Sequence, residues 1–196
     1  MEKEIVCDCG WRVRGDEDEL VAAAQEHGRR AHDMVPTREQ VLATAKPVPT
    51  EEWPMKTIHH VFEIAAPPSR IFEALTTTEG LSGWWTTKVS AQPEVGAVVD
   101  FTFGGDFNPD MRVTTLDPPV LVGWECVGGH EPWAENTFRF ELEEKGGGTV
   151  VRFWQDYARE LSDDAYGTYN FNWGYYLESL RLLGETGTGK PFQAVR

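Results

Sequence analysis

Residues 135–157 read ENTFRFELEEKGGGTVVRFWQDY, two alternating segments on either side of the turn sequence KGGG. Successive side chains of a β-strand point to opposite faces of its sheet. In the first segment the charged Arg139 and Glu141 therefore share one face, and Phe138 and Phe140 occupy the other. In the second segment the same alternation turns four side chains inward: Val151, Phe153, Gln155 and Tyr157. The stretch predicts an antiparallel hairpin with one apolar face.

Further strand-like segments precede this hairpin along the chain. They are TIHHVFEIA, VVDFTF, DMRVTTL and VLVGWECV, and the last three are followed by GGDFNP, DPP and GGHEPW, which are typical turn sequences. Neighbouring strands joined by short loops are antiparallel, because a parallel crossover needs a dozen or more residues. The residues predicted to face inward on these strands are Val99, Phe101, Phe103, Met111, Val113, Val122, Trp124 and Cys126.

Helices are predicted at both ends of this run of strands. PPSRIFEALT and TEGLSGWW follow the first strand, and a helix of about twenty residues begins after Ser162. One stripe of the last helix is apolar, with Tyr169, Trp173, Tyr176, Leu180 and Leu183 at three- and four-residue spacing. The order of elements predicts an α+β fold in which one curved antiparallel sheet wraps round the long C-terminal helix.

The helix stripe changes character along its length. Its second half is aliphatic, whereas its first half carries the polar tips of Tyr169, Trp173 and Tyr176, with Gln155 and Tyr157 on the facing strand. A dry core would have to satisfy all of these polar groups. Polar tips that converge on a concave aromatic wall are typical of a ligand pocket. The alternative is that these side chains simply fill the core.

The segment order resembles the START or SRPBCC superfamily over about residues 56–192, on the strength of PPSRIFEALTTTEGLSGWW and FNWGYYLESLRLLGETGTGKPF. The Trp84–Trp85 pair is most similar to the branch homologous to the activator of the heat-shock-protein-90 ATPase. The resemblance implies a helix-grip fold with a cavity between sheet and terminal helix. Across the superfamily such cavities hold lipids, polyketides, hormones and aromatic compounds, and some members are cyclases, aromatases or hydrolases.

A Pro-rich connection at residues 47–55 separates this domain from a small module at residues 1–46. The module alternates like a short hairpin over IVCDCGWRVRG and continues with two helices, giving a ββαα order. Asp16 with Glu19, and Thr37 with Gln40, are predicted capping boxes. Along the first helix Leu20, Ala24, His27 and Ala31 are predicted to share one face.

Cys7, Cys9, His27 and His32 form a donor set suited to tetrahedral zinc. Five helical residues would set the two histidines about 140° apart, so we expect Gly28 to loosen the helix between them. A module this small rarely folds without a metal, a disulfide or a docked neighbour. The segment also resembles a small family of predicted metal-binding proteins, in its Cys-Gly-Trp turn and its H-x(4)-H helix end. Four protein ligands would make the site closed and structural, with no open position for catalysis. The alternative is a reduced, unliganded cysteine pair with two ordinary histidines.

Charge excludes one class of function. The net charge is −14, from 18 basic and 32 acidic residues, whereas nucleic-acid affinity comes mainly from Lys and Arg that replace phosphate counterions. No apolar run approaches the length of a membrane span. The first residues, MEKEIVCDCGW, lack the basic and apolar regions of a signal peptide. We therefore expect a cytoplasmic protein that has no membrane span and does not bind nucleic acid.

The first hypothesis is a non-catalytic or weakly catalytic domain that binds an apolar or aromatic small molecule resembling a lipid or polyketide. The residues expected to line its cavity are Trp84, Trp85, Phe101, Phe103, Met111, Trp124, Phe138, Phe153, Gln155, Tyr157, Tyr169, Trp173 and Tyr176. A second hypothesis is a cyclase or hydrolase acting on an aromatic substrate through Gln155, Tyr157 or His130. A third is a protein-interaction role, for example with a chaperone, through the outward Trp154 and the acidic surface.

Overall fold

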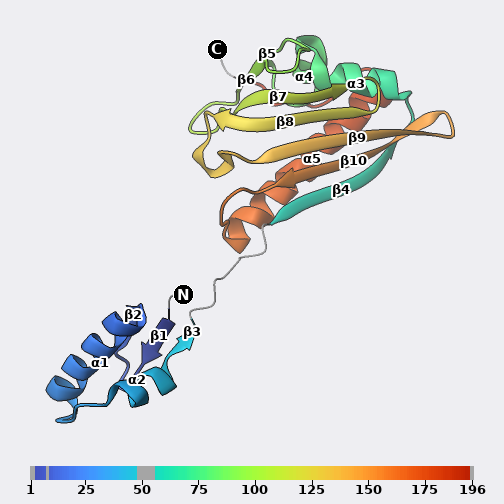
Figure 1. Ribbon diagram of the computed structural model, residues 1–196. Helices are drawn as coiled ribbons and strands as arrows, with labels where there is room; N and C mark the ends of the chain where they lie inside the picture. Colours follow the sequence, from blue (N-terminus) through green and yellow to red (C-terminus); the bar gives the residue numbers. More distant parts are fainter. Residues whose placement is uncertain (1–2, 8, 48–55, 195–196) are drawn as a thin grey trace. The chain divides into compact units, whose positions relative to one another are not determined.

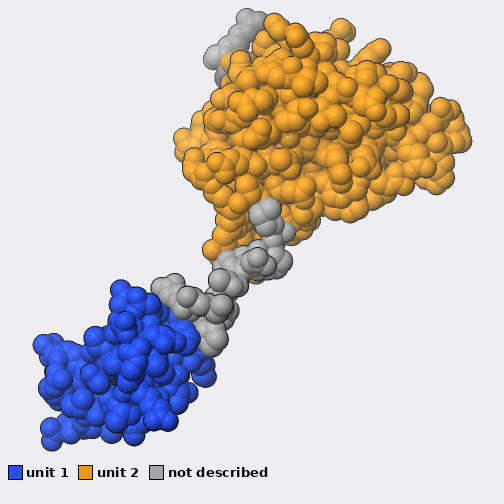
Figure 2. Space-filling model, viewed as in Figure 1, with its two compact units in different colours: residues 1–52 blue, residues 53–196 orange. Residues whose placement is uncertain are grey.

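The computed structural model describes residues 3–7, 9–47 and 56–194 (Figure 1). The chain forms two compact units, residues 1–52 and residues 53–196 (Figure 2). Nearly all of the Pro-rich connection expected at residues 47–55 lies outside the described residues.

The first unit packs two helices against a small sheet. The strands β1 (Lys3–Val6), β2 (Arg12–Gly15) and β3 (Lys46–Pro47) form an antiparallel sheet in the order β2-β1-β3. The helices are α1 (Glu17–Ala31) and α2 (Arg38–Thr44), and both predicted capping boxes are confirmed. The strand β3 was not predicted, because two residues beside a Pro-rich segment carry no alternating pattern. Five buried residues make the core: Ile5, Leu20, Val21, Ala24 and Val41.

The prediction that Ala31 lies on the buried face of α1 is wrong. Ala31 is exposed, whereas Gly28 is buried. The helix ends at Ala31, and the chain then turns back through Asp33, whose φ is +50°. The returning segment crosses Gly28 so closely that a Cβ there would lie 2.7 Å from the carbonyl oxygen of Met34. The apolar face is therefore covered at Gly28, one turn before Ala31.

The second unit is built on a seven-stranded antiparallel sheet in the order β4-β10-β9-β8-β7-β6-β5. Its strands are β4 (Thr57–Ile64), β5 (Lys88–Ser90), β6 (Val98–Thr102), β7 (Asp110–Asp117), β8 (Leu121–Gly128), β9 (Thr137–Lys145) and β10 (Gly148–Asp156). Three-residue β5 at the sheet edge was not predicted. The long helix α5 (Asp163–Thr186) runs behind the sheet in Figure 1. The α+β, helix-grip fold class is therefore confirmed.

The predicted inward side chains are buried, in agreement with the alternation. Phe101, Met111, Trp124, Phe140 and Phe153 are each at most 1% exposed. In the β9–β10 hairpin Phe153 pairs with Phe140 and Gln155 with Phe138, so both strands turn their apolar side chains to α5. The side chain of Trp154 on the outer face is sandwiched, stacked on His59 at 4.6 Å and covered by the Arg139 guanidinium at 4.1 Å.

The helices α3 (Pro68–Thr76) and α4 (Thr78–Trp84) pack against each other and against α5. The two short helices approach most closely at Gly80. A Cβ on Gly80 would lie 2.4 Å from the carbonyl oxygen of Glu73 and 2.5 Å from the Cα of Ala74. Because both contacts are backbone atoms, they cannot move aside as a flexible side chain would. This close approach sets the position of the Trp84–Trp85 pair that follows.

We predict that Gly80→Ala destabilises the second unit by roughly 1–3 kcal/mol, because the added methyl overpacks the α3–α4 contact. The matched control is Gly167→Ala in α5, where a Cβ would meet nothing within 4 Å. The control should stabilise the helix by about 0.5–1 kcal/mol, since alanine loses less backbone entropy than glycine. Urea unfolding followed by tryptophan fluorescence measures both. Equal midpoints for the two variants would contradict the prediction.

Candidate functional site

A cavity of about 430 Å³ opens at one end of the second unit, between α5 and the loops that join the strands. Its wall is aromatic, and its lining residues come from the end of α4, the β6–β7 and β8–β9 loops, α5 and the C-terminal segment. They are Trp85, Phe103, Gly104, Phe107, His130, Trp133, Tyr169, Asn172, Trp173, Tyr176 and Phe192. A volume of this size suits a small organic molecule.

Trp85 and Trp173 form the floor of the cavity. Their rings stack with centroids 5.3 Å apart, and Trp133 also stacks on Trp173 at 5.9 Å. Trp85 also packs on Trp84 at 5.7 Å and on Phe101 at 4.3 Å. The floor is therefore held by rings that pack on one another rather than by a single flexible side chain.

The C-terminal segment closes one side. Phe192 pairs with Thr86 in an isolated bridge, and its N–H donates to the carbonyl oxygen of Trp85 at 2.9 Å. Ser179 of α5 ties the same region together, since its hydroxyl donates to the carbonyl oxygen of Trp84 at 2.8 Å and accepts from the Lys190 N–H at 2.6 Å. These bonds place the Phe192 ring 5.5 Å from Phe103, at the cavity wall.

Two polar side chains face the cavity as a bonded pair. The Nδ1 of His130 lies 3.2 Å from the carbonyl oxygen of Asp106, which can only accept, so Nδ1 carries the ring proton. The Nε2 then accepts from the Tyr169 hydroxyl at 2.9 Å. Burial lowers the pKa of His130 and raises the pKa of Tyr169. Both groups are therefore neutral near pH 7.

Five of the residues expected to line the cavity do so: Trp85, Phe103, Tyr169, Trp173 and Tyr176. The other expected residues are buried in the core behind or below it: Trp84, Phe101, Met111, Trp124, Phe138, Phe153, Gln155 and Tyr157. Gln155 accepts a 2.6 Å hydrogen bond from the indole N–H of Trp173. Alternation identifies the inward side of a strand, but it does not say which inward residues lie at the open end.

Several lining residues were not expected from the sequence. Phe107 and Trp133 belong to the segments GGDFNP and GGHEPW, which carry a turn signal only. Asn172 and Phe192 also line the cavity, at its α5 and C-terminal sides. The aromatic residue in each of these turn sequences could have predicted that the loop packs against the core.

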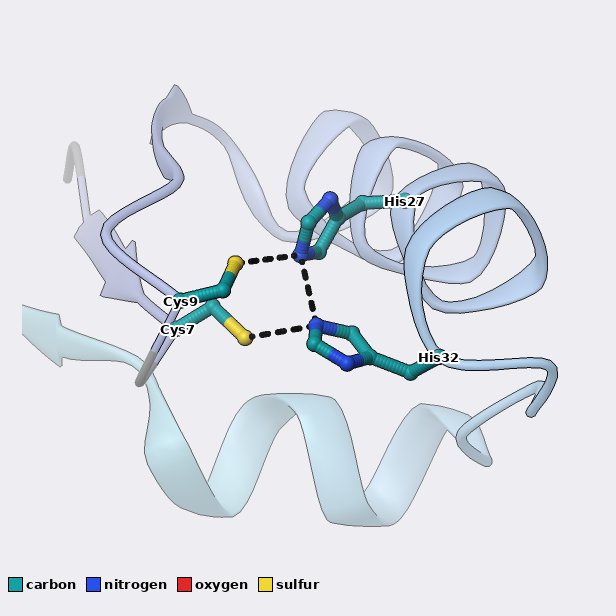
Figure 3. Close-up of side chains that lie close together, drawn as sticks. All are labelled: Cys7, Cys9, His27 and His32. Carbon is teal, nitrogen blue, oxygen red and sulfur yellow. Dashed lines mark hydrogen bonds between the residues drawn. The ribbon is translucent and has the colours of Figure 1, made fainter.

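The four predicted metal ligands of the first unit converge on one point (Figure 3). Cys7 Sγ lies 3.3 Å from His32 Nε2, Cys9 Sγ lies 3.3 Å from His27 Nε2, and the two Nε2 atoms are 3.2 Å apart. All four donor atoms lie within 4.8 Å of one another. With Zn–S bonds of about 2.3 Å and Zn–N bonds of about 2.0–2.1 Å, a regular tetrahedron separates two nitrogens by about 3.3 Å and nitrogen from sulfur by about 3.6 Å. The donor set therefore fits a zinc-sized ion.

Local structure brings these ligands together. The turn after β1 is closed by Cys7 N–H to the Trp11 carbonyl and by Gly10 N–H to the Cys7 carbonyl, each at 2.8 Å. The Trp11 ring stacks on His27 at 4.2 Å. The expectation that Gly28 loosens the helix is wrong, because Gly28 remains helical. His32 reaches the site because it caps the helix end, with φ −132° and ψ 4°, and so leaves the helical spacing.

Two family models match the chain. The model described as Activator of Hsp90 ATPase homolog 1-like protein matches residues 65–185. The chain belongs to the AHSA1-like family. A second model, Protein of unknown function (DUF1059), matches residues 3–47. These matches confirm that the chain joins an AHSA1-like domain to a separate small N-terminal domain of unknown function. The second unit is called the AHSA1-like unit below.

Solved structures agree with this assignment. The Aha1 dimer from Colwellia psychrerythraea is 36% identical, with a TM-score of 0.62, and the match covers 69% of this chain and all of that one. A protein from Mesorhizobium loti is 23% identical with a TM-score of 0.57, over 65% and 96% of the two chains. DynU16, from the dynemicin biosynthetic locus, is 19% identical with a TM-score of 0.59, over 69% and 49%. The search of curated proteins gave no significant match.

Among the described residues, no helix has both the length and the apolar character that a membrane crossing requires.

We predict that His130 in the AHSA1-like unit titrates below 6.5, the ordinary histidine value, because burial disfavours the imidazolium. The unfolded chain then binds the proton first as the pH falls. The neutral histidine contributes stability above the unfolded pKa, and that stability is lost as the pH falls through the lower folded value. An NMR titration of the histidine Cε1–H signals, assigned with His130→Gln, measures the midpoint. A midpoint above 6.5 would contradict the prediction.

Proposed function

We propose that the AHSA1-like unit binds an apolar or aromatic small molecule in the cavity at the start of α5. The supporting observation is the cavity itself, which is walled by stacked tryptophans and carries neutral polar tips. Aromatic rings favour flat apolar partners through stacking and burial, and a few polar groups in an apolar pocket orient its ligand.

Binding is favoured over catalysis by the state of His130. Its Nδ1 donates to a backbone carbonyl and its Nε2 accepts from Tyr169. A general base must come within hydrogen-bond reach of the proton that it takes from the substrate. Here both ring nitrogens are used in holding the loop against α5, which suits a wall of a binding site.

We predict that Tyr176→Ala weakens the binding of an apolar fluorescent probe, N-phenyl-1-naphthylamine, by roughly tenfold, since it removes apolar area from the cavity wall. The matched control is Tyr175→Ala. Tyr175 is the adjacent residue, is 51% exposed and does not line the cavity. Fluorescence titration of the full chain gives both affinities. Equal losses in the two variants, or no binding by the wild type, would count against the proposed cavity.

We also propose that the first unit holds one structural zinc ion through Cys7, Cys9, His27 and His32. Support comes from the donor distances given above and from the small core of five buried residues, which alone stabilises a unit of this size poorly. Two thiolates and two imidazoles fill a tetrahedral shell and leave no position for a substrate. The cysteine pair stays reduced in the cytoplasm, where we place the protein.

We predict one zinc per chain, and we expect Cys9→Ser and His32→Gln each to lower zinc affinity by roughly 100-fold or more. The control is Cys126→Ala, which removes the buried thiol of the AHSA1-like unit and should leave the zinc content unchanged. Elemental analysis and native mass spectrometry measure the metal.

Zinc removal should also act on one unit only. A chelator is expected to abolish hydrogen-exchange protection in residues 3–47 and to leave residues 56–194 protected, because metal binding supplies folding free energy to the first unit alone. Full protection of residues 3–47 after complete metal removal would show that the cluster is not a structural site.

A further inference from the structure

Four buried polar atoms make no hydrogen bond of regular geometry within the described parts of the chain. They are Trp133 Nε1, Asn136 Nδ2, Gln155 Nε2 and the Tyr157 hydroxyl. Their side chains belong to residues that are at most 3% exposed. Each such group costs free energy, because it has lost its hydrogen bonds to water.

These four atoms belong to one region of the molecule. Asp156 pairs with Thr137 across the β9–β10 ladder, so Asn136 and Tyr157 follow directly at the same end of the two strands. The Oδ1 of Asn136 accepts from the Ala158 N–H at 3.0 Å, and the Asn136 N–H donates to the Trp133 carbonyl at 2.9 Å. Burial raises the pKa of Tyr157, and polar side-chain contacts with Trp133 and Gln155 lower it, so the hydroxyl, the indole N–H and the amide face one another. We call these four side chains the polar subsite.

Other buried polar side chains of the same unit are satisfied. The hydroxyls of Thr76, Thr86, Thr149 and Ser179 each donate to a backbone carbonyl. Unsatisfied groups in a native protein call for an explanation one by one. That all four belong to one end of the β9–β10 pair points to a shared cause rather than to scattered imperfect packing.

The polar subsite adjoins the cavity. Trp133 belongs to both, and Gln155 is bonded to Trp173 of the cavity floor. The Tyr157 ring lies 6.3 Å from the ring of Tyr169, which lines the cavity. Trp133 therefore links the cavity to the polar subsite, whose other three residues lie directly behind the cavity wall.

The chemistry of the polar subsite selects its ligand group. The indole and the two amides are donors, and the hydroxyl can donate or accept. The groups that act on Tyr157 are Tyr169, Trp133, Tyr166 and Gln155, none of which is a cation. A buried carboxylate or phosphate would need an opposite charge, whereas a carbonyl oxygen with two lone pairs needs only neutral donors.

We propose that Trp133, Asn136, Gln155 and Tyr157 form a recognition site for a neutral carbonyl oxygen carried by the aromatic ligand of the cavity. This inference rests on the proposed function and narrows it from apolar aromatic molecules to aromatic ketones and related carbonyl compounds. The polar groups supply selectivity, because a site built to hydrogen-bond a ligand group rejects the analogue that lacks it.

The test compares 9-fluorenone with fluorene, two flat aromatic molecules of nearly equal size that differ in one carbonyl group. Isothermal titration calorimetry on the full chain gives the affinity of each for the wild type, Tyr157→Phe and Gln155→Glu. Tyr157→Phe removes only the hydroxyl group of the side chain. Gln155→Glu exchanges the free amide nitrogen for oxygen and keeps the acceptor of Trp173. Tyr175→Phe, on the exposed side of α5, is the matched control, and circular dichroism checks that each variant is folded.

We expect each of the two variants to reduce the ratio of fluorenone to fluorene affinity by roughly tenfold relative to the wild type and to Tyr175→Phe, with fluorene affinity unchanged. The ratio between variants cancels the different hydrophobicity of the two compounds. If both compounds bind and the ratio is the same in all four proteins, the polar subsite is overturned while the cavity proposal stands. If neither compound binds the wild type, the cavity proposal fails and the polar subsite fails with it.

Discussion

The AHSA1-like unit depends on how Trp173 holds α5 against the sheet. Its indole N–H donates to Gln155 at 2.6 Å, and its ring packs on Phe153 at 4.4 Å and on Trp85 at 5.3 Å. At the other end of the helix Gly184 has no side chain, and a Cβ there would lie within 2.8 Å of Ile64 and Ile71. The helix thus approaches the core closely at Gly184, while bulky rings separate it from the sheet at Trp173. This uneven spacing between α5 and the sheet explains why the aromatic cavity opens at the Trp173 end, and why the aliphatic Leu177 and Leu180 are fully packed between the two ends.

The uneven spacing between α5 and the sheet also limits what the alternation of strand side chains can predict. Phe101, Met111 and Phe153 face inward as their strand patterns require, yet they lie in the packed part of the gap. Three cavity-lining residues lie in loops, whose sequences have no regular side-chain periodicity: Phe107, His130 and Trp133. Those loops turn at Gly104 and Gly129, both with positive φ, and Gly129 passes so close to the Asn108 carbonyl that a side chain is excluded. The glycines were visible in the sequence, but the direction in which they turn the chain depends on tertiary contacts.

The Cys/His cluster of the first unit shows the opposite case, in which the residue types predicted that the four side chains share a site and regular helix geometry was misleading. Two thiols and two imidazoles in a small module indicated a shared site, although helical spacing alone separates His27 from His32. The structure resolves this at the helix end, where Asp33 adopts a positive φ and the Met34 N–H donates to the Gly28 carbonyl at 3.1 Å. A helix cap breaks the 3.6-residue period, so a histidine at a helix terminus is free to reach a point that a mid-helix residue cannot.

Two features at one end of the AHSA1-like unit reduce its stability. Aromatic rings hold the sheet and α5 apart there, and buried polar groups there lack regular hydrogen bonds. A fold selected only for stability would pack the gap and bond or remove Tyr157, since replacing an unsatisfied buried group by an apolar one is close to neutral or better. The satisfied threonines and Ser179 elsewhere in the unit indicate that its core is otherwise well bonded. A ligand of the kind proposed above, filling the cavity and accepting those hydrogen bonds, would restore both losses at once. Its binding would stabilise the folded unit in proportion to the logarithm of its concentration over Kd.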